Sequence, residues 1–125
     1  MPRTEVVFYR DDDGSAPVLD ALRRFLREGQ RKEFAKCQVR ITRLTACGHE
    51  LRRPEADYLR DGVWELRITH RRVHHRILYF FAGERRAVLS HLIIKEASVP
   101  DSEIANACLH RALFLADPER HTFHE

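Results

Sequence analysis

The chain has 125 residues, of which 43% are hydrophobic and 33% are charged, and its formal net charge is +3. This length favours one domain over residues 1–125, and the composition is globular rather than disordered. No apolar run approaches the roughly 18 residues of a membrane span, and the start of the chain lacks the apolar core of a signal peptide. We therefore expect a cytoplasmic protein that has no membrane partner.

The first part of the chain predicts one strand and two helices. Residues 4–9 form a short β-type run, and a turn rich in Asp and Gly follows it. Ser15 is placed to cap a helix that runs to about Glu28. A second, longer helix is expected to end at Gly48. Its apolar positions recur every three or four residues, at Phe34, Cys37, Ile41 and Leu44.

The second part predicts three strands and a helix. Residues 49–62 are interpreted as a polar connection, and a helix is expected to begin near Pro100. The order β-α-α-β-β-β-α indicates an α+β domain with a mostly antiparallel four-stranded sheet, an N-terminal helical hairpin and a C-terminal helix. Residues 117–125 are expected to be a loose tail. The three strands are expected at residues 63–69, 73–81 and 87–95, and the apolar positions of the last helix include Ile104, Cys108, Ala112 and Leu115.

Arginine is concentrated in one stretch of the chain. Residues 51–76 contain seven arginines against four acidic residues, together with three histidines. The planar guanidinium group suits phosphate, because it can donate two parallel hydrogen bonds. The alternative interpretation is a solvated hairpin whose edge charges discourage aggregation. The arginines lie at positions 52, 53, 60, 67, 71, 72 and 76.

Strand periodicity assigns these charges to faces of the sheet. Glu65 and Arg67 are expected on one face of their strand, and Trp64, Leu66 and Ile68 are expected on the other. Arg76 falls in a strand with large apolar groups on both faces, so its side chain needs a partner. Two partners are possible, namely an internal carboxylate such as Glu65 or the phosphate of a ligand in a cleft.

Three basic residues on neighbouring strands predict an anion-binding cage. Arg67, Arg76 and Lys95 each lie near the middle or end of a different predicted strand, and adjacent strands are about 4.8 Å apart. Such a cage would stabilise the crowded phosphate that forms when RNA is cleaved by its own 2′-hydroxyl group. His91 or Glu65 is the candidate for proton transfer.

Four further residues are candidates for contact with RNA. Tyr79 is placed to stack on a base or to donate a hydrogen bond, although a core aromatic residue is the alternative. The remaining candidates precede it in the same stretch and are Arg71, Arg72 and His74.

Other chemistries find little support in the sequence. His70 and His74 would match a helical zinc pair, but this stretch has the pattern of a strand and turn. Cys47 and His49 complete no four-ligand pattern, and the cysteines on helix faces are expected to be reduced and inert. The chain has no Walker loop, no dinucleotide-binding glycine pattern and no G-x-S-x-G elbow. We therefore expect no metal and no cofactor.

Four segments resemble a known family in the same order along the chain. They are "VVFYRDDDGSAPVLDAL", "LRDGVWELRI", "HRILYFF" and "KEASVPDSEIANA". Over about residues 4–116 the chain is similar to HigB-like toxins of the RelE/ParE superfamily, in a phage-derived branch. The resemblance implies a toxin of a toxin–antitoxin pair that cleaves mRNA on the ribosome and is neutralised by a helix-turn-helix antitoxin.

The resemblance also transfers residue by residue. Arg67 and Arg76 match basic strand positions of the family, and Lys95 matches the first of a basic pair that closes the last strand. The second of that pair is Glu96 here, and a negative charge at a phosphate site should weaken catalysis. A binding-only relic of the family is therefore one alternative. A ParE-like inhibitor of gyrase, from another branch of the superfamily, is a second.

Overall fold

The computed structural model describes residues 3–94 and 97–125 of the chain. The following elements are given in chain order: β1 (Glu5–Phe8), α1 (Pro17–Arg27), α2 (Arg31–Cys47), the short 3-10 helix η1 (Gly48–Glu50), β2 (Ala56–Arg60), β3 (Val63–His70), β4 (Val73–Phe81), β5 (Arg86–Ile94) and α3 (Asp101–Ala116). None of the helices in the described part of the chain is both long and apolar enough to cross a membrane.

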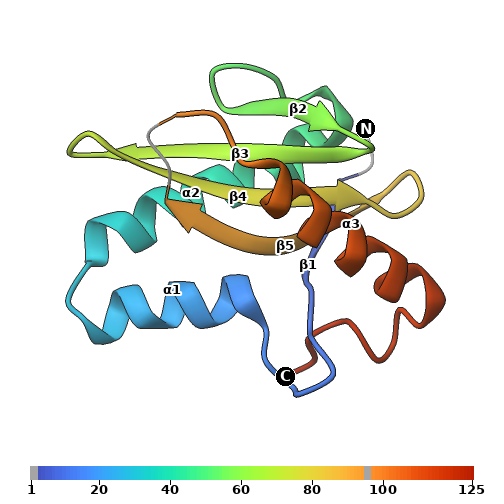
Figure 1. The fold of residues 1–125 in the computed structure, drawn as a ribbon. Coiled ribbons are helices and arrows are strands. Elements are labelled where there is room, and N and C mark those ends of the chain that lie inside the picture. Colours follow the sequence, from blue (N-terminus) through green and yellow to red (C-terminus); the bar gives the residue numbers. More distant parts are fainter. Residues whose placement is uncertain (1–2, 95–96) are drawn as a thin grey trace.

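The strands form one sheet in the order β1-β5-β4-β3-β2 (Figure 1). β1 runs parallel to β5, and the other neighbouring strands are antiparallel. The α+β class predicted from the sequence is therefore confirmed, with one more strand than expected. β3, β4 and β5 are central strands, so their side chains are covered on both faces over much of their length.

Helices cover the two faces of the sheet unequally. α1 and α2 pack on one face, where Leu22 and Leu44 join a core with Leu66, Ile68 and Ile77 of the sheet. α3 lies on the other face (Figure 1). Its apolar cluster with the sheet includes Val63 of β3, Leu78 of β4 and Ile93 of β5. The turn that joins β3 to β4 lies at the end of the sheet away from the β4–β5 turn and extends beyond α3 (Figure 1).

The boundaries of the first two helices follow local chemistry. Pro17 occupies the first turn of α1, where no backbone donor is needed. The prediction that Ser15 caps this helix is wrong, because its hydroxyl donates to Asp13 at 2.6 Å and Ala16 is the capping residue. α2 ends at Gly48 as predicted, where φ is 53° and an added Cβ atom would clash with Oγ1 of Thr4.

The segment expected to be a polar connection contains the additional strand, β2. Ala56 pairs with Leu66, and Tyr58 pairs with Trp64, so β2 extends the sheet at its edge. Its sequence, ADYLR, is short and charged, which is typical of an edge strand that resists pairing with other chains. Short length and charge therefore made this strand resemble a loop.

The buried face of α3 differs from the one expected. Ile104 is buried as predicted, but Leu115 is 58% exposed, and Ala107, His110 and Phe114 point to the sheet instead. The helix is apolar on most sides, so its sequence pattern could not select the inner face.

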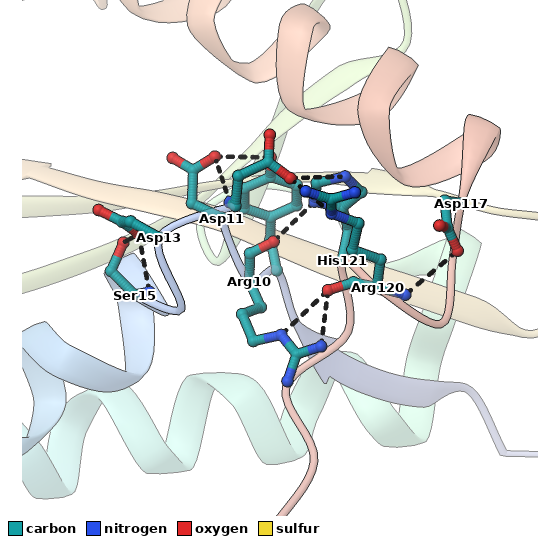
Figure 2. Close-up of polar contacts among 9 residues, drawn as sticks. Arg10, Asp11, Asp13, Ser15, Asp117, Arg120 and His121 are labelled. Atoms are coloured by element: carbon teal, nitrogen blue, oxygen red, sulfur yellow. Dashed lines mark hydrogen bonds and ion pairs between the residues drawn. The ribbon is translucent and has the colours of Figure 1, made fainter.

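The segment after α3 is packed against the start of the chain, and the expectation of a loose tail is wrong. His121 is 3% exposed, and its backbone carbonyl accepts a hydrogen bond from Arg10 at 2.8 Å. Figure 2 shows the Arg10 guanidinium group donating to the carbonyl oxygen of Arg120. Thr122 also forms a β-bridge with Tyr9.

Candidate phosphate-binding site

The two predicted strand arginines lie directly opposite each other. Arg67 on β3 and Arg76 on β4 are partners in the antiparallel register. Side chains two residues apart share a face of a strand, so Arg67 and Glu65 lie on the face of Val63, which α3 covers. Arg76 lies on that same face, two residues before Leu78. The register therefore brings both guanidinium groups to one side of the sheet.

Glu65 is the internal partner of both arginines. Its side chain is 1% exposed, and its carboxylate oxygens lie 3.2 Å from Nη1 of Arg76 and 3.5 Å from Nε of Arg67. Of the two partners that the sequence allowed for Arg76, the structure contains the internal carboxylate. The side chain of Arg67 nevertheless remains 36% exposed, whereas that of Arg76 is 13% exposed. A buried carboxylate thus holds two arginines side by side, one of them open to solvent.

A hollow of about 420 Å³ opens beside this pair. It lies at the end of the sheet near the β3–β4 hairpin, where β2 no longer covers the edge of β3. Arg40 of α2 joins the strand residues in its wall. The hollow is lined by Arg40, Pro54, Arg67, Ile68, Thr69, His74, His75 and Arg76.

Positive charge exceeds negative charge around the hollow. Glu55 is shared by Arg40 at 3.1 Å and Arg43 at 2.9 Å, and the pKa of this carboxyl group is lowered chiefly by its hydrogen bonds with Arg43. Asp57 is shared by Arg53 and Arg67 in the same way. With Glu65, three carboxylates meet five arginines in these contacts. Shared carboxylates fix the guanidinium groups without cancelling their total charge.

The tip of the β3–β4 hairpin adds two more arginines in an unusual backbone conformation. Arg71 and Arg72 have φ values of 49° and 68°, and both are exposed. A two-residue turn of this kind normally uses Asn-Gly, because side chains disfavour positive φ. Non-glycine residues in this conformation cost about 1 kcal/mol each, and such costs gather at functional positions.

Two histidines of β4 line the hollow in different ways. His74 is paired with Thr69 in the register, and its Nδ1 lies 3.1 Å from the Thr69 hydroxyl oxygen. His75 points to the other face, where it packs edge-on against Phe25 and burial lowers its pKa. Its Nδ1 has no hydrogen-bond partner among the described residues.

His91 does not line this hollow. It lies on β5 under α3, 8% exposed, with its Nδ1 2.9 Å from Oγ of Ser90 and its Nε2 3.3 Å from Glu103. Burial lowers the pKa of His91, while nearby Glu103 acts against this shift, and α3 keeps the imidazole out of solvent. A direct role in proton transfer at the arginine pair is therefore not supported. Lys95, the third member of the expected cage, lies outside the described residues, as does Glu96.

Tyr79 is a core residue, which corrects the expectation of contact with RNA. Its side chain is 0% exposed and belongs to the cluster under α1 and α2. Burial raises the pKa of its hydroxyl, which has no hydrogen-bond partner in the described part of the chain. The alternative interpretation of Tyr79, a core aromatic residue, is the one that the structure supports.

The cysteines and histidines do not gather into a metal-binding group. Within residues 3–94 and 97–125, no three side chains of His, Cys, Asp or Glu are placed to hold one ion. Cys37 is buried and free, and burial raises the pKa of its thiol to about 11, as expected for an inert core cysteine.

Sequence reasoning did not name five of the residues that line the hollow as site candidates, namely Arg40, Pro54, Ile68, Thr69 and His75. Thr69 could have been found, because it lies two residues after Arg67 and so shares its strand face. Arg40 could not, because nothing local shows where α2 lies against the sheet. His75 was not a site candidate, because its place in the wall of the hollow depends on the register of β4.

The fold and the hollow together define a small α+β protein with an arginine-lined concave surface at one end of its sheet. The model of the phage-derived Gp49-like family (DUF891) matches residues 24–108, more than half of the chain, so the chain belongs to this family. The family is one of RelE/HigB-like toxins. No curated protein is similar enough to the chain to count as a match.

Proposed function

We propose that this protein is the toxin of a type II toxin–antitoxin pair and cleaves mRNA on the ribosome. The observation that carries the proposal is the pair formed by Arg67 and Arg76, in register on neighbouring strands beside an open hollow. The pair favours phosphate binding, because Glu65 lies within ion-pair distance of both guanidinium groups and keeps them on one face of the sheet. The proposed partners are mRNA and a helix-turn-helix antitoxin, and the proposed location is the cytoplasm.

The proposed reaction needs no metal. The 2′-oxygen of the RNA forms a bond to phosphorus while the bond from phosphorus to the 5′-oxygen breaks, which leaves a 2′,3′-cyclic phosphate and a 5′-hydroxyl. The crowded phosphate carries extra negative charge in the transition state, and Arg67 and Arg76 are placed to stabilise it. Arg71 and Arg72 at the hairpin tip are proposed to hold the RNA backbone on either side of that phosphate.

The first test changes Arg76. We expect Arg76→Ala to abolish growth arrest and RNA cleavage, but it also leaves the buried Glu65 carboxylate with one distant partner, which costs about 3 kcal/mol of stability or more. Arg76→Lys keeps a positive charge beside Glu65 and loses the planar fork, so it should fold normally and cleave roughly 100-fold more slowly. Cleavage is measured by primer extension on a defined message with purified ribosomes, and folding by thermal melting.

Arg85→Ala is the matched control. Arg85 is exposed in the β4–β5 turn, at the end of the strands opposite to the hollow. Its substitution should change neither the cleavage rate nor the melting temperature. Normal cleavage by a folded Arg76→Ala protein would remove Arg76 from the site.

The shared carboxylates also support a second candidate function. Glu65 and Asp57 already contact the arginines that would meet RNA, and Glu96 replaces a basic residue of the family pattern. A protein with this arrangement could keep the fold and the antitoxin interface without cleaving RNA. Appearance of cleavage in Glu96→Lys, with none in the unchanged protein, would favour this relic.

The type of damage in cells distinguishes the gyrase-blocking alternative from mRNA cleavage. Induced expression of an mRNA-cleaving toxin should yield transcript fragments mapped to translated messages, with intact DNA. DNA breaks with intact transcripts would indicate the ParE-like activity instead.

A further inference from the structure

We propose that His74 is the general base of this reaction and that Thr69 is its positioning residue; the inference rests on the proposed function. His74 and Thr69 are direct partners in the β3–β4 register, one step along each strand face from the pair formed by Arg67 and Arg76. All four residues line the same hollow. They therefore form a four-membered patch on one face of the hairpin.

The spacing of this patch fits a phosphodiester. Residues two apart on a strand are about 6.6 Å apart, and directly paired residues are about 5 Å apart. A phosphate held between the two guanidinium groups would place its sugar next to His74. Figure 1 shows this part of the hairpin extending beyond α3, and the hollow opens here.

Thr69 can select the histidine tautomer that a base requires. The Thr69 hydroxyl oxygen lies 3.1 Å from Nδ1 of His74 and can accept a hydrogen bond from that nitrogen. The proton then resides on Nδ1, and Nε2 keeps its lone pair for the 2′-hydroxyl proton of the RNA. In the step, Nε2 takes this proton as the 2′-oxygen attacks phosphorus, and the departing 5′-oxygen receives a proton from water.

The other candidates for proton transfer are less suitable. Glu65 is 1% exposed, with its carboxylate against both arginines, so it has no path to a substrate hydroxyl. His91 is enclosed under α3. The charged or titratable groups that line the hollow together with His74 are Arg40 from α2, Arg67 from β3, and His75 and Arg76 from β4.

The experiment compares His74→Gln with the unchanged protein in single-turnover cleavage of ribosome-bound message. The glutamine can still bond to Thr69 but cannot carry a proton, so we expect a rate at least 100-fold lower with RNA binding within about twofold. Thr69→Ala should slow cleavage about tenfold, and Thr69→Ser should restore it.

A substrate with sulfur in place of the scissile 5′-oxygen shows whether His74 acts as the general base or as the general acid. Thiolate leaves without a proton, so the defect of His74→Gln should persist if His74 is the base, and its disappearance would overturn that role. His124→Gln, an exposed histidine in the C-terminal segment, is the matched control. Cleavage by His74→Gln within threefold of normal would overturn the inference alone, whereas no cleavage by the folded, unchanged protein would overturn the proposed function and the inference with it.

Discussion

Ion pairs and hydrogen bonds around single buried polar residues explain how this small sheet accommodates many charged side chains. Glu65 has 1% of its side chain exposed and lies within ion-pair distance of Arg67 and Arg76. One carboxylate and two guanidinium groups are therefore grouped on one face of the sheet. On another part of the same face, His110 of α3 points to the sheet with its Nδ1 2.7 Å from Oγ of Ser90, and its ring stacks on Tyr9 at 4.0 Å between centroids. The first group is placed for an anion, and the second fixes α3 to the sheet.

The buried histidine predicts a loss of stability in acid. Burial lowers the pKa of His110 from 6.5 to about 4, with a further contribution from nearby His91. The unfolded chain therefore binds a proton more readily than the folded one, and stability that is complete above about pH 6.5 falls as the pH drops toward 4. The full loss from this residue is on the order of 3 kcal/mol.

Urea unfolding at several pH values between 4.5 and 7.5 measures this dependence. His110→Phe keeps an aromatic ring against Tyr9 but cannot take up a proton, so its profile should be flatter than that of the unchanged protein. Parallel profiles for the two proteins would show that His110 does not control acid stability.

At the scale of elements, the turn of the β3–β4 hairpin has a sequence that lowers the stability of the fold. Arg71 and Arg72 occupy the two positive-φ positions of the turn, where Asn-Gly is preferred. Replacing both by Asn-Gly should therefore raise the free energy of unfolding by about 1 to 2 kcal/mol. It should also weaken RNA binding and reduce the dependence of log affinity on log salt by about 1.4, the value for two phosphate contacts on a single strand.

Denaturant titration and RNA binding at several salt concentrations measure the two effects. Changing both arginines to lysine keeps the charges in the same turn and serves as the control, with binding close to normal. If the Asn-Gly protein bound RNA as tightly as the unchanged one, the hairpin tip would have no contact with RNA.

At the scale of the whole molecule, the C-terminal segment closes the fold against its beginning. Phe123 donates its backbone N–H to the carbonyl of Phe8, and His121 and Arg10 are joined by two further bonds that involve backbone groups (Figure 2). Removing residues 117–125 should lower the free energy of unfolding by about 2 kcal/mol or more, since Tyr9, now 0% exposed, would meet solvent. Removing residues 124–125 alone should have little effect. A shortened chain that unfolds at the same urea concentration would contradict this account.

The sequence by itself determined the features that depend on short-range periodicity. The α+β class, the ends of α2 at Gly48 and of β4 at Phe81, and the shared face of Glu65 and Arg67 all follow from spacings within one element. The resemblance along the chain also agreed with its membership of the Gp49-like family.

Only the tertiary structure decided which residues meet. The register that places Arg67 opposite Arg76 and Thr69 opposite His74 follows from the two-residue turn at Arg71 and Arg72, and the sequence Arg-Arg does not predict such a turn. The contribution of Arg40 depends on the packing of α2 against the sheet, a contact between parts of the chain far apart in sequence. Tyr79 was misplaced for the same reason, because a central strand carries apolar groups on both faces and its period alone cannot say which face is covered.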